Sequence, residues 1–348
     1  MSFSPTNPLY IESLHKILQL IDYDFMRGKS ILVTGATGMI GSCLIDTLML
    51  LNKDGVGVTV YAVGRSREKV LKRFSYCCND STFKFLEQDV QDPLPMDLKV
   101  DFIIPLASYT HPLAYSQFPI ETIFINVNGA RNALELAARC GATVIYPSSV
   151  EIYGNAYREE PFKEQDTGEL YLSTARACYT ESKRLCEAMC QSYISERGVD
   201  ARILRFSRVF GPTMLMEDSK ASSQFIKKAI AGEDIILKSE GNQFFSYTYV
   251  LDAISAILCI IGGGCCGEAY NVASKEFNVY LRSFASACAK YAGTNVVFDI
   301  PSEIERKGYS VAAYAIMDGT KLNDIGWKPL FSFKDAIRMT LSLMSQGD

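Results

Sequence analysis

The sequence predicts an α/β protein with a Rossmann-type doubly wound parallel sheet and a smaller mixed α/β C-terminal lobe. Short apolar runs typical of strands alternate with segments of helical periodicity, beginning with 30–34 and 40–51 and continuing to 201–206. Such alternation indicates parallel strands covered by helices on both faces. A glycine-rich turn joins the first predicted strand to the helix after it, the place where folds of this class bind ligands.

Each predicted element follows from its local pattern. Apolar runs predict strands at 30–34, 58–63, 102–106, 143–146 and 201–206, and helical spacing predicts helices at 40–51, 67–73, 120–139 and 179–197. Beyond residue 212 the pattern is less regular, with a helix expected at 222–231 and a strand at 243–249. The apolar stretch 253–261 is too short to span a bilayer, so we expect a buried helix there.

The domain organisation follows from this change of pattern. Apolar residues recurring at offsets of three and four predict a leading amphipathic helix within 1–28. Residues 29–206 are expected to form the dinucleotide-binding domain, to which 243–273 returns. Residues 207–242 and 274–348 are then expected to form a substrate-binding lobe, with the ligand cleft between the two parts.

Composition excludes several classes of protein. A chain of 348 residues with 48% hydrophobic content can bury a large core, which argues against a disordered or fibrous protein. A net charge of -4 without a basic run predicts neither a nucleic-acid partner nor a membrane partner. Eleven cysteines, an odd number without a secretory signal, indicate reduced thiols and a cytoplasmic location. With only two histidines, no metal site is expected.

The glycine-rich turn spans Gly35, Thr37, Gly38, Met39, Ile40 and Gly41. The first glycine permits a tight turn, the second lets a pyrophosphate approach the backbone, and the third allows the helix to pack closely on the sheet. The helix N-terminus adds free N–H donors and a positive dipole. Because the turn lies between a clear strand and a clear helix, it predicts a dinucleotide site.

The residues after the next two strands bear on the choice of cofactor. An acidic residue usually ends the second strand when NAD is bound, but Arg65 follows this strand and is suited to the 2′-phosphate of NADP. Asp89 and Val90 follow the third apolar run, where a carboxylate can accept a hydrogen bond from the adenine amine. The pattern at these residues leaves NAD and NADP both open.

A possible catalytic set follows the strand at 143–146. Tyr179 and Lys183 lie four residues apart on one helix, so their side chains share a face. A neighbouring ammonium favours the phenolate and brings a tyrosine pKa down from about 10, as a general base requires. Ser149 follows its strand at the ligand-binding edge and can donate a hydrogen bond to a substrate oxygen. The three residues are suited to hydride transfer at a carbinol carbon.

These segments together resemble the extended short-chain dehydrogenase/reductase family, also described as the NAD-dependent epimerase/dehydratase family. The resemblance covers nearly the whole chain after residue 28. It is also carried by Leu106-Ala107-Ser108, Asn126-Val127-Asn128-Gly129, Arg205-Phe206-Ser207-Arg208-Val209-Phe210-Gly211-Pro212 and Gly326-Trp327-Lys328-Pro329. Within the family, the motifs are most similar to the UDP-glucuronate decarboxylase branch.

The resemblance implies a role for each matched residue. It implies that Ser149 and Tyr179 are catalytic, that Lys183 binds the nicotinamide ribose, and that Glu151 is a distinguishing carboxylate of the site. It also implies cofactor contacts from 106–108, substrate contacts from Ser149, Glu151, Tyr179 and Arg208, and assembly as a homodimer.

The implied activity is modification of a nucleotide-linked sugar through transient oxidation at C4, with decarboxylation of a UDP-glucuronate type substrate placed first. A 4-epimerase is the nearest alternative, and a 4,6-dehydratase ranks lower because Val150 replaces its usual aspartate. Arg65 keeps open an NADPH-dependent reductase of an activated sugar or polyol. A non-catalytic dinucleotide-binding protein is disfavoured by the intact Ser149, Tyr179 and Lys183 set.

The chain departs from the family where the substrate diphosphate is usually held by arginine. Phe245 occupies one such region, and Val311-Ala312-Ala313 occupies the other. Arg208 stands where the family usually has a substrate-contacting asparagine. Arg208, Lys220 and Lys227 are therefore the candidates for the missing positive charge.

Overall fold

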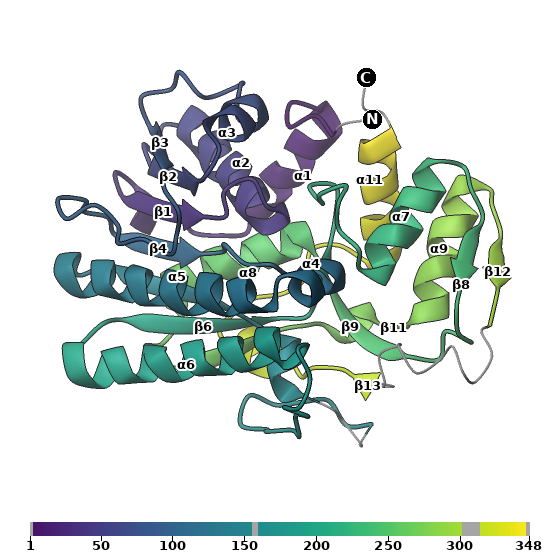
Figure 1. The fold of residues 1–348 in the computed structure, drawn as a ribbon. Coiled ribbons are helices and arrows are strands. Elements are labelled where there is room, and N and C mark those ends of the chain that lie inside the picture. Colours follow the sequence, from purple (N-terminus) through teal and green to yellow (C-terminus); the bar gives the residue numbers. More distant parts are fainter. Residues whose placement is uncertain (1–2, 155–158, 301–313, 346–348) are drawn as a thin grey trace.

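A parallel sheet organises the part of the chain that the computed structural model describes, residues 3–154, 159–300 and 314–345. In these residues seven strands pair in the order β10-β6-β5-β4-β1-β2-β3, and every pairing is parallel (Figure 1). The strands are β1 (Ser30–Thr34), β2 (Thr59–Gly64), β3 (Phe83–Glu87), β4 (Phe102–Pro105), β5 (Thr143–Ser149), β6 (Ala201–Phe206) and β10 (Ala269–Val272). The order reverses beside β1, so the predicted doubly wound sheet is confirmed and its carboxyl edge opens between β1 and β4.

Helices cover both faces of this sheet. On one face α2 (Met39–Lys53) packs against α8 (Val250–Gly263), and α1 (Pro8–Leu18) packs on both of them. On the other face α5 (Pro119–Cys140) and α6 (Ala177–Arg197) run side by side (Figure 1). Two buried hydrophobic clusters correspond to these two faces. The apolar stretch of α8 is therefore buried inside the protein, as its sequence predicts.

The leading helix α1 is tied to helix α2 by a buried polar contact. Asn7 caps the helix, and its side chain accepts a hydrogen bond from the Leu9 N–H at 2.9 Å. The buried Tyr10 hydroxyl donates to Asp46 of α2 at 2.9 Å. Arg73 pairs with the same carboxylate, which leaves the buried Asp46 charge compensated.

The C-terminal lobe is built on smaller sheets. The central strand β9 pairs with three others in the described residues, and β8 pairs with β12. These strands are β7 (Arg208–Phe210), β8 (Ile235–Leu237), β9 (Phe244–Tyr249), β11 (Asn278–Tyr280), β12 (Val296–Phe298) and β13 (Tyr314–Ala315). Within the segment 243–273, β9 therefore belongs to the smaller sheet, whereas α8 and β10 lie with the large sheet.

Helices of the lobe pack around these strands, and short elements complete the described chain. In the lobe α7 (Ala221–Ile230), α9 (Leu281–Ala292) and α11 (Phe333–Ser345) contact one another (Figure 1). The remaining elements are α3 (Arg67–Arg73), α4 (Pro112–Gln117), α10 (Thr320–Asp324) and the 3₁₀ helices η1 (Asp24–Met26), η2 (Val150–Tyr153) and η3 (Lys275–Phe277). The carboxyl edge of the large sheet faces this lobe, and the two together enclose the candidate site.

Candidate active site

A cavity of about 1270 Å³ lies at the carboxyl edge of the large sheet. The turn after β1, the ends of β2, β4 and β5, the start of α6 and the C-terminal lobe all contribute to its walls. The structure brings into this one cavity all the predicted catalytic residues and cofactor contacts, together with Arg208. They are Gly35, Thr37, Gly38, Met39, Ile40, Gly41, Arg65, Asp89, Val90, Leu106, Ala107, Ser108, Ser149, Glu151, Tyr179, Lys183 and Arg208. Its size suits a dinucleotide together with a second ligand.

The glycine turn has the shape that close approach of phosphate needs. Gly35 has φ 63°, and a Cβ there would lie 2.8 Å from the Ala107 nitrogen. At Gly41 a Cβ would collide with the Gly35 carbonyl oxygen, so only glycine lets α2 begin this close to the turn. Gly38 is the N-cap of α2, and the first N–H groups of the helix border the cavity. The turn therefore fits the pyrophosphate of a dinucleotide.

Arg65 lies at the end of β2, between two carboxylates. Its Nη1 is 3.8 Å from Asp89 Oδ2 and 3.5 Å from Glu121 Oε1. The Tyr109 hydroxyl donates to the same Glu121 oxygen at 3.2 Å. The charge of the guanidinium is thus balanced by groups that sequence reasoning did not connect with it, because Glu121 lies on α5 and Tyr109 in the loop after β4.

Ser149, Tyr179 and Lys183 meet on one wall of the cavity. The Ser149 side chain hydrogen-bonds with the Tyr179 phenol, and its Oγ also accepts from the Glu151 N–H at 3.2 Å. The Lys183 Nζ donates to the Pro147 carbonyl at 2.8 Å and lies 6.0 Å from the centroid of the Tyr179 ring. The α6 helix that carries Tyr179 and Lys183 packs along β5, which ends in Ser149.

The pKa of Tyr179 differs from the expectation. Burial raises it well above the usual value, and the hydrogen bond from Ser149 lowers it only in part. The predicted lowering by Lys183 is wrong for this structure, because the ammonium is directed to the Pro147 carbonyl and is itself disfavoured by burial. Burial lowers the pKa of Lys183 to about 8.

The lowered pKa of Lys183 predicts that this residue costs stability. The pKa falls from 10.5 to about 8 on folding, so the unfolded chain binds more protons between these values and stability rises with pH across that window. Replacing Lys183 by methionine should therefore raise the free energy of unfolding at pH 7 by about 1 to 3 kcal/mol. Urea unfolding at several pH values measures this difference, which should shrink as the pH rises above 8.

The matched control for this substitution is Lys228→Met. Lys228 is exposed and pairs with Glu233 on the surface, so its replacement should change stability by less than about 0.5 kcal/mol at any pH. A Lys183→Met protein that is less stable than the parent at pH 7 would show that the hydrogen bond to Pro147 outweighs the burial of the charge.

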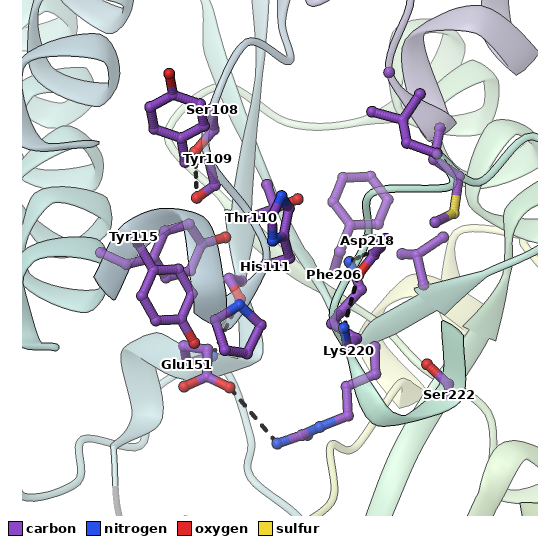
Figure 2. A pocket seen from close by; sticks show the side chains of 18 of the residues that line it. Ser108, Tyr109, Thr110, His111, Tyr115, Glu151, Phe206, Asp218, Lys220 and Ser222 are labelled. Atoms are coloured by element: carbon purple, nitrogen blue, oxygen red, sulfur yellow. Dashed lines mark hydrogen bonds and ion pairs between the residues drawn. The ribbon is translucent and has the colours of Figure 1, made fainter. Parts of the chain in front are cut away.

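Other residues of the cavity come from α4 and its N-cap, between β4 and α5, and were not singled out from the sequence. Tyr115 stacks on Tyr179 with ring centroids 5.5 Å apart, and His111 Nδ1 is 3.1 Å from Ser219 Oγ. Figure 2 shows Tyr115 and Glu151 on one side of the pocket and Lys220 with Asp218 across from them. Their position in the connection that leaves β4 at the ligand edge is the signal that could have identified Tyr115 and His111.

The candidates for the missing positive charge differ in position. Arg208 and Lys220 line the cavity, whereas Lys227 donates to the Met216 and Asp218 carbonyl oxygens at 3.0 and 2.9 Å. Lys220 is paired with Asp218 at 2.6 Å. The segment 311–313, expected to lack a family arginine, lies outside the described residues.

Across residues 3–154, 159–300 and 314–345 no cluster of His, Cys, Asp and Glu could hold a metal ion. All eleven cysteines are free thiols. In the same ranges, every helix is too short or too polar to cross a bilayer.

Comparison with known proteins identifies the family. Residues 31–273 match the family model described as the NAD dependent epimerase/dehydratase family. UDP-glucuronic acid decarboxylase 1 of Xenopus tropicalis is 30% identical over 320 residues, which are 90% of this chain and 71% of that protein. UDP-glucuronic acid decarboxylase 6 of Arabidopsis thaliana is 34% identical over 239 residues, covering 69% of this chain and 68% of that protein.

Solved structures show the same fold. A UDP-N-acetylglucosamine 4-epimerase from Methanobrevibacter ruminantium superposes with a TM-score of 0.78 at 21% identity, covering 91% of this chain and 98% of that one. A UDP-glucose 4-epimerase from Thermotoga maritima superposes with a TM-score of 0.77 at 22% identity, covering 90% of this chain and 98% of that one. The predicted resemblance is confirmed: the chain belongs to the NAD-dependent epimerase/dehydratase family and is an enzyme of the extended short-chain dehydrogenase/reductase type.

Proposed function

We propose that this enzyme acts on a nucleotide-linked sugar through transient oxidation at C4, and that its reaction is decarboxylation of a UDP-glucuronate type substrate. The observation that carries the proposal is the meeting of Ser149, Tyr179 and Lys183 in one cavity with the glycine turn. The curated relatives that are UDP-glucuronic acid decarboxylases support the choice of substrate. These residues are proposed to be catalytic, with Glu151 beside them.

The chemistry follows from the positions of the side chains. Tyr179 accepts the proton of the C4 hydroxyl, and Ser149 holds the same oxygen by a hydrogen bond. NAD, when bound, would supply the hydride acceptor. Lys183, which lines the same cavity, is proposed to bind the nicotinamide ribose. A C4 ketone makes the C6 carboxylate a β-keto acid, so the C5–C6 bond breaks with release of carbon dioxide and its electron pair passes into an enolate. Uptake of a proton at C5 and return of the hydride to C4 would complete the reaction and regenerate NAD.

NAD is proposed as the cofactor in preference to NADP. Arg65 is the residue suited to a 2′-phosphate, but Asp89 and Glu121 already lie within 4 Å of its guanidinium. A phosphate entering there would meet two negative charges, whereas the uncharged 2′-hydroxyl of NAD would not. A 4-epimerase uses the same C4 chemistry and is the second candidate function, favoured by the fold of the solved epimerases.

A panel of UDP-, GDP-, CDP- and dTDP-sugars, each incubated with the enzyme and NAD, tests the proposal by product mass. We expect the product of UDP-glucuronate to be lighter by one carbon dioxide, about 44 mass units, without accumulation of NADH. A product of unchanged mass and altered stereochemistry would instead establish an epimerase. Stoichiometric consumption of NADPH with a keto-sugar would establish a reductase.

We also propose that the enzyme is a cytoplasmic homodimer. The eleven free thiols support a reducing compartment. Large apolar side chains are exposed on α4, α5 and α6, in agreement with pairing through these helices. They include Leu113, Phe118, Ile120, Phe124 and Leu185.

A further inference from the structure

Arg208 is held in an unusual way for a cationic side chain beside a substrate cavity. Its guanidinium carbon lies 3.8 Å from the centroid of the Phe245 ring, close enough for stacking on the aromatic face. Its Nη2 is 3.6 Å from Glu151 Oε1, which is an ion pair without a close hydrogen bond. Its Nη1 is buried and has no hydrogen-bond acceptor among the described residues. Buried donors of this kind are normally satisfied, so the guanidinium has capacity for another acceptor.

The position of Glu151 shows which end of the cavity this guanidinium reaches. Glu151 lies two residues after Ser149 in the chain, and its backbone N–H donates to the Ser149 hydroxyl oxygen. Glu151 also acts on the pKa of Tyr179, which it raises after the larger effect of burial. The paired Arg208 therefore lies beside the groups that act on sugar C4. A sugar bound with C4 against these groups would therefore lie closer to Arg208 than its diphosphate would.

An arginine at that place is suited to a carboxylate. A guanidinium presents parallel N–H donors that match both oxygens of a carboxylate, and the Phe245 ring packs against the guanidinium of Arg208. Glu151 lies 3.6 Å from the Arg208 Nη2, which is too long for a good hydrogen bond. A second carboxylate can therefore compete with Glu151 for Nη2 and also accept a hydrogen bond from the unpaired Nη1. Without Arg208, a substrate carboxylate in this region would face the negative charge of Glu151.

We propose that Arg208 is the residue that selects a hexuronate, by binding the C6 carboxylate in exchange for Glu151. This inference rests on the proposed function. The exchange releases Glu151 beside the sugar at the moment the substrate is bound. It also explains how the chain keeps a cation in the cavity although Phe245 occupies a region where its family usually carries arginine.

The test is calorimetric titration of the full chain with NAD present, in a Tyr179→Phe background that prevents turnover. UDP-glucuronate, UDP-glucose and UDP are titrated into the parent, Arg208→Gln, Glu151→Gln and the surface control Lys228→Gln. Arg208→Gln should weaken the binding of UDP-glucuronate by about 30-fold or more, because the substrate carboxylate loses its proposed hydrogen-bonded partner. UDP-glucose and UDP should change by less than about threefold, which also shows that the variant is folded.

Glu151→Gln gives the sharper outcome, because its effect should have the opposite sign. Removing the competing carboxylate should raise the affinity for UDP-glucuronate severalfold and leave the affinity for UDP-glucose unchanged. If Arg208→Gln lowers the affinity for all three ligands equally, the residue instead contacts the diphosphate. If it lowers none of the three affinities, Arg208 takes no part in binding. If the parent binds none of the three, the proposed function itself fails, which is a different result from loss of discrimination.

Discussion

Replacing Tyr179 by phenylalanine is expected to lower kcat by about 10² to 10⁴-fold, because the substitution removes the proposed proton acceptor. The buried ring would remain and would still stack on Tyr115, so the fold and the affinity for NAD should change little. Single-turnover assays with the sugar nucleotide found in the product panel measure the chemical step. Quenching of protein fluorescence measures NAD binding in parallel.

The matched control is Tyr193→Phe on the same helix. The Tyr193 hydroxyl donates to Glu135 at 2.6 Å and does not line the cavity, so its loss should leave kcat within about twofold of the parent. A Tyr179→Phe enzyme with full activity would rule out the phenol as the base.

Replacing Gly41 by alanine is expected to abolish productive cofactor binding. The added Cβ would overlap the Gly35 carbonyl oxygen, which is backbone and cannot move without opening the phosphate turn. We expect a loss of about 1 to 3 kcal/mol in the free energy of unfolding, as for other overpacked sites. NAD affinity should fall by more than about tenfold, because the N–H donors of the turn would no longer converge. Calorimetry with NAD and urea unfolding measure the two effects.

Gly263 offers the control, since it also lies in a helix but has no heavy atom within 4 Å of the position of an added Cβ. Gly263→Ala should leave NAD affinity unchanged and stability equal or slightly higher. Equal behaviour of the two variants would mean that the turn does not bind the dinucleotide through its backbone.

Local patterns in the sequence were sufficient for the fold class, the glycine turn and the catalytic candidates in the cavity, but not for most of the wall that the C-terminal lobe contributes. A strand such as 30–34 and the helix after it are recognised from short-range periodicity, and the glycine turn lies between them. Because parallel strands end at one edge, residues that follow different strands, such as Ser149 and Asp89, could be expected in the same cavity. The Tyr179 and Lys183 spacing needed only helical geometry.

Pairs between distant elements could not be predicted in this way. Nothing near Arg65 in the chain indicates Glu121, which reaches it from α5. The stacking of Arg208 on Phe245 depends on β7 pairing with β9, a contact across the C-terminal lobe. The ion pair of Arg208 with Glu151 then joins that lobe to the end of β5.

The amino-acid sequence by itself determined the order of strands and helices, the phosphate turn and the identity of the residues that meet at the sheet edge, because these depend on neighbours in the chain. Only the tertiary structure decided the charge states and partners of those residues. Burial lowers the pKa of Lys183 and raises that of Tyr179. The packing around Arg208 leaves its buried Nη1 without a hydrogen-bond acceptor among the described residues. Desolvation depends on everything packed around a group, and most of those atoms are far away in sequence.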